Sequence, residues 1–126
     1  MRYMMLIYSR ETPSPAEQQH GVVLRHREVM NEAREQAIFQ GAEPLEPPTT
    51  AVTVRKNGDG KMMVTDGPFA ETKEQLAGYY ILECKSIEEA IEWARKIPTG
   101  CHGGEGCIEI RPIRAMNVQV EVGHAT

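Results

Sequence analysis

The stretch Thr65-Asp66-Gly67-Pro68-Phe69-Ala70-Glu71-Thr72-Lys73-Glu74-Gln75-Leu76-Ala77-Gly78-Tyr79-Tyr80 connects a predicted hairpin to a hydrophobic strand. Asp66 stands directly before a Gly-Pro turn, and the aromatic Phe69 directly follows that turn. A carboxylate, an apolar side chain and backbone N–H groups are therefore held close together. We expect this turn to form a corner that binds a small molecule.

The residues on either side of the turn predict its structural context. Residues 51–55 and 61–65 flank Asn57-Gly58-Asp59-Gly60, whose residues tolerate positive φ, so the segment predicts a β-hairpin. Thr72 and Gln75 have the spacing of a capping box, which predicts one helical turn. Residues 78–85 then carry apolar side chains on both faces of a predicted strand.

The N-terminal part of the chain predicts a strand and a long helix. Residues 3–8 are apolar at every position, which is typical of a central strand in a covered sheet. Ser14, Pro15 and Glu17 provide the signals of a helix start, and we expect Gly41 to end this helix. Residues 42–48 contain three prolines, so we expect little regular structure there, or an edge position.

The C-terminal part predicts a second helix and two further strands. Ser86 and Glu89 form a capping box, and Pro98 ends the helix that follows. Residues 107–111 alternate as a half-buried strand does. Residues 115–126 also alternate in polarity, and such an isolated strand needs a sheet edge to pair with, for example in a second subunit.

The order strand, helix, hairpin, strand, helix, strand predicts an α+β fold with a β-α-β-β-α-β plan and an inserted β-hairpin. A chain of 126 residues suits one domain, which we place at residues 1–114, followed by the tail at 115–126. Two helices cover only one face of a sheet, yet two of the predicted strands are apolar on both faces. We therefore expect a homodimer whose sheets face each other.

Composition excludes several classes of partner. The chain carries 14 basic and 18 acidic residues, mixed along its length, for a net charge of −4. This pattern gives no electrostatic surface for nucleic acid. No run of about 18 apolar residues indicates a membrane span, and we expect a cytoplasmic protein with no membrane partner. The three cysteines are expected to be free thiols.

Two residues are candidates for catalysis. Asp66 is the first, as a general acid or base or as a ligand anchor, if burial beside Phe69 raises its pKa. The alternative is that Asp66 caps its own turn by accepting hydrogen bonds from backbone N–H groups. His26 is the second, because it interrupts the apolar stripe of the first helix. It can act as a proton shuttle, or be a partly buried histidine with one satisfied ring nitrogen.

Neither a metal site nor a cofactor site is expected. Cys84, Cys101, His102 and Cys107 are soft ligands of the kind that zinc prefers, but the spacing C-H-x4-C lacks the usual C-x2-C knuckle. The glycines of residues 103–106 precede a strand rather than a helix N-terminus, which is the wrong context for a phosphate-binding loop.

Residues 62–98 resemble the DGPF branch of the YCII-related family. The likeness runs from Met-Val-Thr-Asp-Gly-Pro-Phe-Ala-Glu-Thr-Lys-Glu-Gln-Leu through Gly-Tyr-Tyr to Glu-Trp-Ala-Arg-Lys-Ile-Pro, and more loosely to both ends of the domain. This resemblance implies a ferredoxin-like sandwich that forms a dimeric α/β-barrel-like assembly, and an accessory role beside extracytoplasmic-function sigma factors. Some members of the wider family look like enzymes with a His-Asp pair in a cleft near the dimer interface. The equivalent of that histidine falls near Met30 here, not on His26.

Two functions remain as hypotheses. In the first, which we favour, the domain is a non-catalytic module that binds a small molecule or serves a regulatory role. In the second, it is a small enzyme that uses Asp66 for acid-base chemistry in a cleft near the dimer interface. The expected ligand-binding residues, among which Arg111 orients a carboxylate, are Asp66, Gly67, Phe69, Tyr80 and Arg111.

Overall fold

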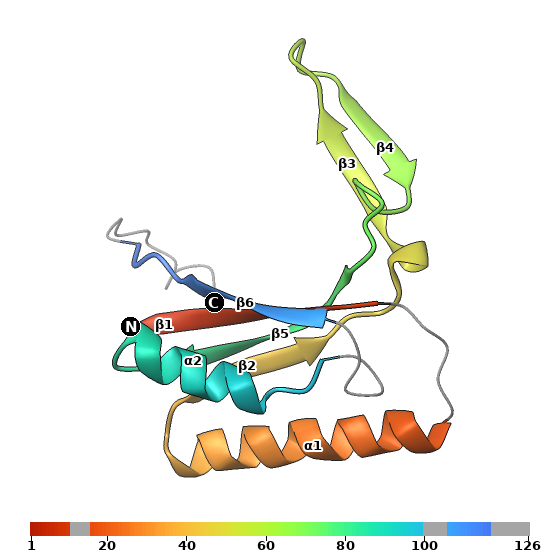
Figure 1. The fold of residues 1–126 in the computed structure, drawn as a ribbon. Coiled ribbons are helices and arrows are strands. Elements are labelled where there is room, and N and C mark those ends of the chain that lie inside the picture. The colour runs from red at the N-terminus through yellow and green to blue at the C-terminus, as the bar shows by residue number, and fades with distance from the viewer. Residues whose placement is uncertain (11–15, 100–105, 117–126) are drawn as a thin grey trace, which may run out of the picture.

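The computed structural model describes residues 1–10, 16–99 and 106–116 of the chain. They form two α-helices, six β-strands and one short 3-10 turn (Figure 1). In chain order these elements are β1 (Arg2–Ser9), α1 (Ala16–Glu35), β2 (Phe39–Pro44), the 3-10 turn (Pro48–Thr50), β3 (Val52–Lys56), β4 (Met62–Asp66), β5 (Gln75–Glu83), α2 (Ile87–Lys96) and β6 (Gly106–Pro112).

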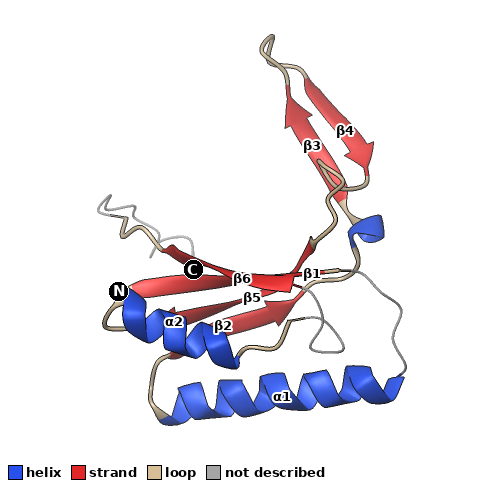
Figure 2. Ribbon diagram, in the orientation of Figure 1, coloured by secondary structure: helices blue, strands red, loops and turns tan. Residues whose placement is uncertain are grey.

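The main sheet has four strands in the order β2-β5-β1-β6, and all neighbouring strands are antiparallel. Each central strand, β1 or β5, is followed by a helix that returns the chain to an edge strand. Both helices lie on one side of the sheet (Figure 2). The predicted ferredoxin-like α+β fold is therefore confirmed.

The core lies between this sheet and the two helices. On β1 the buried side chains are Tyr3, Met5 and Ile7, whereas Met4 and Leu6 are half-buried on the opposite face. The helix-facing side is closed by the buried residues Val29, Ala33, Tyr80, Leu82, Cys84, Ala90, Trp93 and Ile97. The opposite side of the main sheet, which we call the open face, is covered by neither helix (Figure 2).

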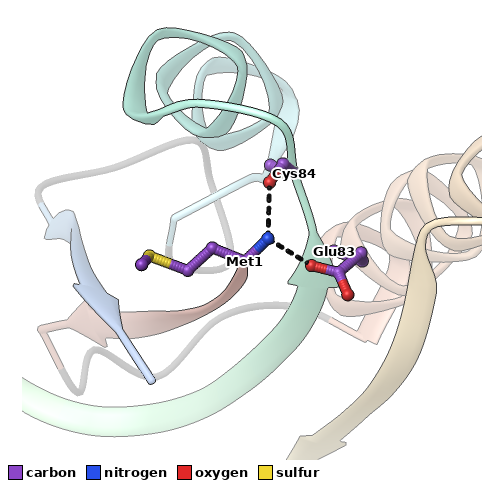
Figure 3. Close-up of polar contacts among 3 residues, drawn as sticks. All are labelled: Met1, Glu83 and Cys84. Atoms are coloured by element: carbon purple, nitrogen blue, oxygen red, sulfur yellow. Dashed lines mark hydrogen bonds and ion pairs between the residues drawn. The ribbon is translucent and has the colours of Figure 1, made fainter. Parts of the chain in front are cut away.

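The first residue fastens the start of β1 to the end of β5. The Met1 amine lies 2.7 Å from a carboxylate oxygen of Glu83 and donates a hydrogen bond of 3.2 Å to the carbonyl oxygen of Cys84 (Figure 3). The Cys84 N–H in turn donates to the Met1 carbonyl oxygen at 3.0 Å. The β1–β5 pairing therefore extends to the loop that begins α2.

The predicted capping box of α2 is confirmed at its serine. The Ser86 side chain accepts a hydrogen bond of 3.2 Å from the Glu89 backbone N–H. Glu88 and Glu89 lie in the first turn, and Arg95 and Lys96 lie in the last. Acidic side chains at the positive N-terminal end of the helix dipole and basic ones at its negative C-terminal end stabilise the helix. The helix ends at Lys96, two residues before Pro98.

The predicted end of the first helix is wrong. Helix α1 ends at Glu35 rather than at Gly41, and Ala37 takes the left-handed conformation, with φ of +61°. The Ile38 N–H donates to the Ala33 carbonyl oxygen at 3.0 Å, which closes the helix end. Gly41 instead lies in β2, beside an irregularity in the pairing with β5.

The segment at residues 42–48 is more regular than expected at its start. Strand β2 occupies Phe39–Pro44, and among the described strands it pairs only with β5, so it lies at the edge of this sheet. An edge strand tolerates a proline because one side of its backbone forms no ladder bonds. The alternative of an edge position for this segment is confirmed, and irregular structure begins only after Pro44.

The predicted hairpin is confirmed, but it does not join the main sheet. Strands β3 and β4 form a separate two-stranded sheet, which we call the arm (residues 52–66). The arm rises from one end of the main sheet on the side opposite the helices (Figure 1). At its tip the Gly60 N–H donates to the Asn57 carbonyl oxygen at 2.9 Å, and Gly60 has φ of +86°.

The helical turn predicted at Thr72–Gln75 is absent from this described segment. The Thr72 hydroxyl donates to the Glu74 carbonyl oxygen, and the Gln75 amide donates to the Thr72 carbonyl oxygen. Side-chain contacts with the backbone thus close a bend that leads directly into β5, and they replace the expected cap.

Several predictions concern residues outside the described ranges. They are the helix start at Ser14 and Pro15, the candidate metal ligands Cys101 and His102, and the tail strand after Met116. Within the described residues, no helix combines the length and the hydropathy that a membrane span requires.

Candidate functional site

A cavity of about 630 Å³ lies between α1 and the main sheet. Helix α1 forms one wall, and strands β1, β2 and β5 form the other. The segment that follows β2 and the residue Pro98 also contribute to its lining. The lining residues are Ile7, Ser9, Val22, Val23, His26, Arg27, Met30, Ala42, Glu43, Pro44, Leu45, Pro47, Ala77, Gly78, Tyr79, Tyr80 and Pro98.

One polar pair lies among these mostly apolar residues. The Nδ1 atom of His26, on α1, is 2.7 Å from the hydroxyl oxygen of Tyr80, on β5. The Tyr80 hydroxyl is also 3.3 Å from the His26 backbone carbonyl oxygen. The ring centroids are 5.8 Å apart, so the pair bridges the helix and the sheet at one wall of the cavity.

The local sequence explains why these two side chains meet. Tyr80 and Leu82 alternate on the face of β5 that packs against the helices, and Tyr80 is only 2% exposed. His26 precedes Val29 and Ala33 by three and seven residues, so all three lie on the buried face of α1. A buried polar group requires a hydrogen-bond partner, and the His26 ring and the Tyr80 hydroxyl serve as partners for each other.

Burial keeps both groups uncharged near neutral pH. Desolvation lowers the pKa of His26 from its ordinary value of 6.5. Desolvation likewise raises the pKa of Tyr80 above its ordinary value of 10.0. A neutral imidazole therefore faces a protonated phenol.

The tautomer of His26 decides the direction of this contact, because the Tyr80 hydroxyl has one proton and two partners within reach. If Nδ1 carries the imidazole proton, Nδ1–H donates to the hydroxyl oxygen and the Tyr80 O–H donates to the His26 carbonyl oxygen. If Nε2 carries it, the Tyr80 O–H donates to Nδ1 and Nε2–H is a second donor. Among the described residues no hydrogen bond reaches Nε2. In the Nε2–H tautomer, this lining residue therefore has an N–H that none of the described residues accepts.

The residues of the Gly-Pro turn lie elsewhere, at the base of the arm. Asp66 is exposed, and within the described part of the chain no hydrogen bond reaches its carboxylate. The Gly67 N–H donates to the Ala51 carbonyl oxygen at 2.7 Å, and Gly67 has φ of +101°. Phe69 is 79% exposed. Neither the expected burial of Asp66 nor its expected capping contact is formed.

The structure therefore brings together only two of the candidate residues named from the sequence. His26 and Tyr80 meet at the cavity, whereas Asp66, Gly67 and Phe69 are absent from its lining. Arg111 lies on β6 opposite Met4, on the open face of the main sheet.

Some lining residues were not named as candidates from the sequence. Arg27 and Glu43 are the charged residues of the lining, and Val22, Met30 and Ala42 are apolar residues of its wall. The helical stripe that contains Val22, His26 and Met30 was visible in the sequence. No local pattern in the sequence indicated which part of that stripe does not pack against the sheet and so lines a cavity.

Comparison with known proteins agrees with the architecture. The family model described as YCII-related domain matches residues 1–117. An uncharacterized protein of Rhizobium meliloti (strain 1021) is 34% identical over 115 residues, which cover 90% of this chain and 92% of that protein. The family match spans the main sheet, the two helices, the cavity and the arm. The chain therefore belongs to the YCII-related domain family.

Proposed function

We propose that this protein binds a small, mainly apolar molecule in the cavity between α1 and the main sheet. The observation that carries the proposal is the His26–Tyr80 pair in a mostly apolar lining. The proposal takes the His26 proton to lie on Nε2, which leaves one N–H donor for a ligand. A volume of about 630 Å³ suits a small organic molecule, since ligand pockets are typically about 300–1,000 Å³.

The chemistry of the lining defines the ligand class. Aliphatic side chains, prolines and the ring of Tyr80 favour a hydrocarbon or aromatic body. The Nε2–H of His26 requires an acceptor, so the ligand carries a carbonyl or a similar oxygen. Arg27 and Glu43 balance each other in charge at the lining, which favours a neutral ligand over an ion.

Matched probes test this class directly. Acetophenone combines a phenyl ring with a carbonyl acceptor, and ethylbenzene has nearly the same shape without the acceptor. Titrations followed by ¹H–¹⁵N NMR should show acetophenone binding several-fold tighter, because one net hydrogen bond contributes about 0.5–1.5 kcal/mol. The shifted resonances should belong to α1, β2 and β5.

Two variants distinguish binding in this cavity from binding elsewhere on the molecule. His26→Phe keeps the ring volume but removes the donor, so it should abolish the preference for acetophenone over ethylbenzene. Asp66→Asn should leave both affinities unchanged, since Asp66 is absent from the cavity lining. Shifts that map to the arm instead, or a preference that survives His26→Phe, would contradict the proposal.

A catalytic alternative is favoured by one feature of the same pair. A neutral imidazole with one ring nitrogen held and the other free is the arrangement of a general acid or base. In this alternative His26 exchanges a proton with the ligand through Nε2, and Tyr80 keeps the ring in position. The hypothesis with Asp66 as the acid-base group requires a different site, at the base of the arm.

We also infer that the chain belongs to the DGPF branch of the family, on the strength of the Asp66-Gly67-Pro68-Phe69 motif. An accessory role beside a sigma factor and a cytoplasmic location stay predictions of that resemblance and of the sequence. A pull-down with the tagged protein from its native host tests the first of these, and a sigma factor should be enriched.

A further inference from the structure

A second polar group belongs to the lining of the cavity, apart from the His26–Tyr80 pair. Ser9, the last residue of β1, is half-buried and lines the cavity. Among the residues that the structure describes, no hydrogen bond reaches its hydroxyl group. A half-buried hydroxyl without a protein partner is available to a ligand.

The pleat of β1 places Ser9 on the face toward the helices. Side chains alternate along a strand, so Ser9 shares its face with the buried residues Met5 and Ile7. The preceding residue, Tyr8, lies on the open face, where its hydroxyl contacts Glu109 of β6. The Ser9 hydroxyl is therefore directed to the side of the sheet that forms the cavity.

The register of the sheet sets the separation between the two polar groups. Tyr80 pairs with Met5. Ser9 lies four residues farther along β1, which is about 13 Å at the usual rise per residue. Between these two levels Ile7 pairs with Gly78, a residue without a side chain. Along the cavity, a polar group is thus followed by an apolar stretch and then by a second polar group.

The charged residues of the lining are weaker candidates for a second ligand contact. Arg27 and Glu43 are both exposed, so water already hydrates them. A hydrogen bond from a ligand to such a group replaces one to water and adds little net affinity. The half-buried Ser9 is therefore the more selective partner.

We propose that the ligand of this cavity carries an oxygen at each end of an apolar body, and that Ser9 binds the second oxygen. This inference rests on the proposed function, in which His26 binds the first oxygen. A serine hydroxyl both donates and accepts hydrogen bonds, so the second oxygen belongs to a hydroxyl or a carbonyl group. The ligand class is thus an elongated hydroxyketone or diketone.

Three ketones that share one body test this class. 4-Phenylbutan-2-one carries one oxygen, and 4-(4-hydroxyphenyl)butan-2-one adds a hydroxyl group at the opposite end. 4-(4-Methylphenyl)butan-2-one has an apolar methyl group in place of that hydroxyl. Titrations followed by ¹H–¹⁵N NMR give the three dissociation constants. The ratio between the hydroxyphenyl and methylphenyl ketones isolates the contact at the second end.

Three variants change or preserve this ratio. Ser9→Ala should shift it about fivefold or more against the hydroxyphenyl ketone, because the ring hydroxyl is then buried without a partner. The same variant should bind 4-phenylbutan-2-one nearly as wild type does. Ser9→Thr keeps a hydroxyl group and should keep the wild-type ratio. Tyr8→Phe removes the neighbouring hydroxyl, on the open face, and should change none of the three dissociation constants.

His26→Phe separates this inference from the proposed function. It should weaken all three ketones by the same factor, since each has the carbonyl that His26 binds, and it should leave the ratio unchanged. If the ketones bind through His26 but Ser9→Ala keeps the wild-type ratio, Ser9 is no ligand contact, and this inference is wrong while the proposed function stands. If no ketone binds through His26, the proposed function fails and this inference fails with it.

Discussion

Replacement of Tyr80 by phenylalanine removes one hydroxyl group and tests the polar pair at the cavity wall. The ring stays in the core, so the change removes only the two contacts of the hydroxyl, at 2.7 Å to His26 Nδ1 and at 3.3 Å to the His26 carbonyl oxygen. Two effects should follow. The domain should lose stability, and the pKa of His26 should rise, because a donor to Nδ1 favours the neutral imidazole.

The expected loss of stability is about 1 kcal/mol. A neutral hydrogen bond contributes about 0.5–1.5 kcal/mol net, and an unsatisfied buried acceptor costs about 1–3 kcal/mol. His26 is half-buried and lines the cavity, so water can reach the vacated Nδ1 and the loss stays near the lower figure. For a domain of this size, 1 kcal/mol corresponds to a fall in Tm of about 4 °C.

Urea denaturation and thermal melting measure this loss, and Tyr79→Phe is the control. Tyr79 is the next residue along β5, and within the described residues its hydroxyl has no hydrogen bond. Its replacement should change stability by less than about 0.5 kcal/mol. Equal losses in both variants, or a Tyr80→Phe protein as stable as wild type, would refute the role assigned to the pair.

Three further predictions concern particular groups. Burial lowers the native pKa of His26 below 6.5, so the stability that its neutral form contributes is complete above pH 6.5 and is lost as pH falls below that value. Urea denaturation between pH 7 and pH 5 should show the free energy of unfolding fall with pH, and His26→Phe should lack this contribution. Gly78→Ala places a Cβ 2.7 Å from the Glu43 carbonyl oxygen, so it should displace β2, lower Tm by several degrees and weaken probe binding. Gly67→Ala should cost about 1 kcal/mol in thermal melts, because φ of +101° suits only glycine, and it should leave probe binding intact.

The central elements of the fold could be predicted because their signals are local. Continuous apolar runs predicted β1 and β5 as central strands, and the serine cap with a terminating proline predicted α2. The Asn-Gly-Asp-Gly turn predicted the hairpin. In each case a short stretch contains both the apolar pattern and its boundaries, so no tertiary information is needed.

Other elements could not be predicted because tertiary pairing decides them. Strand β2 has a glycine, a proline and few β-forming residues, and it becomes a strand because β5 offers an open edge. Ala37 takes the positive φ that Gly41 was expected to supply, since the start of β2 fixes where the helix ends. The hairpin was predicted, but its separation from the main sheet was not.

The candidate site was predicted in its parts but not as an arrangement. His26 and Tyr80 were each named as candidates, yet 54 residues separate them and no local pattern indicated their contact. For Asp66 the sequence left two alternatives open, burial beside Phe69 or a cap of its own turn, and the arm instead leaves it exposed. The predicted turn itself exists, with Gly67 in the conformation that it requires.

The most direct test of the binding site is the protonation state of the two ring nitrogens of His26, measured by ¹⁵N NMR at pH 7 with and without acetophenone. We predict a neutral ring with the proton on Nε2, and a shift of that Nε2 resonance when acetophenone binds. A charged ring, a proton on Nδ1, or an Nε2 chemical shift that does not change when acetophenone binds would contradict the proposed site.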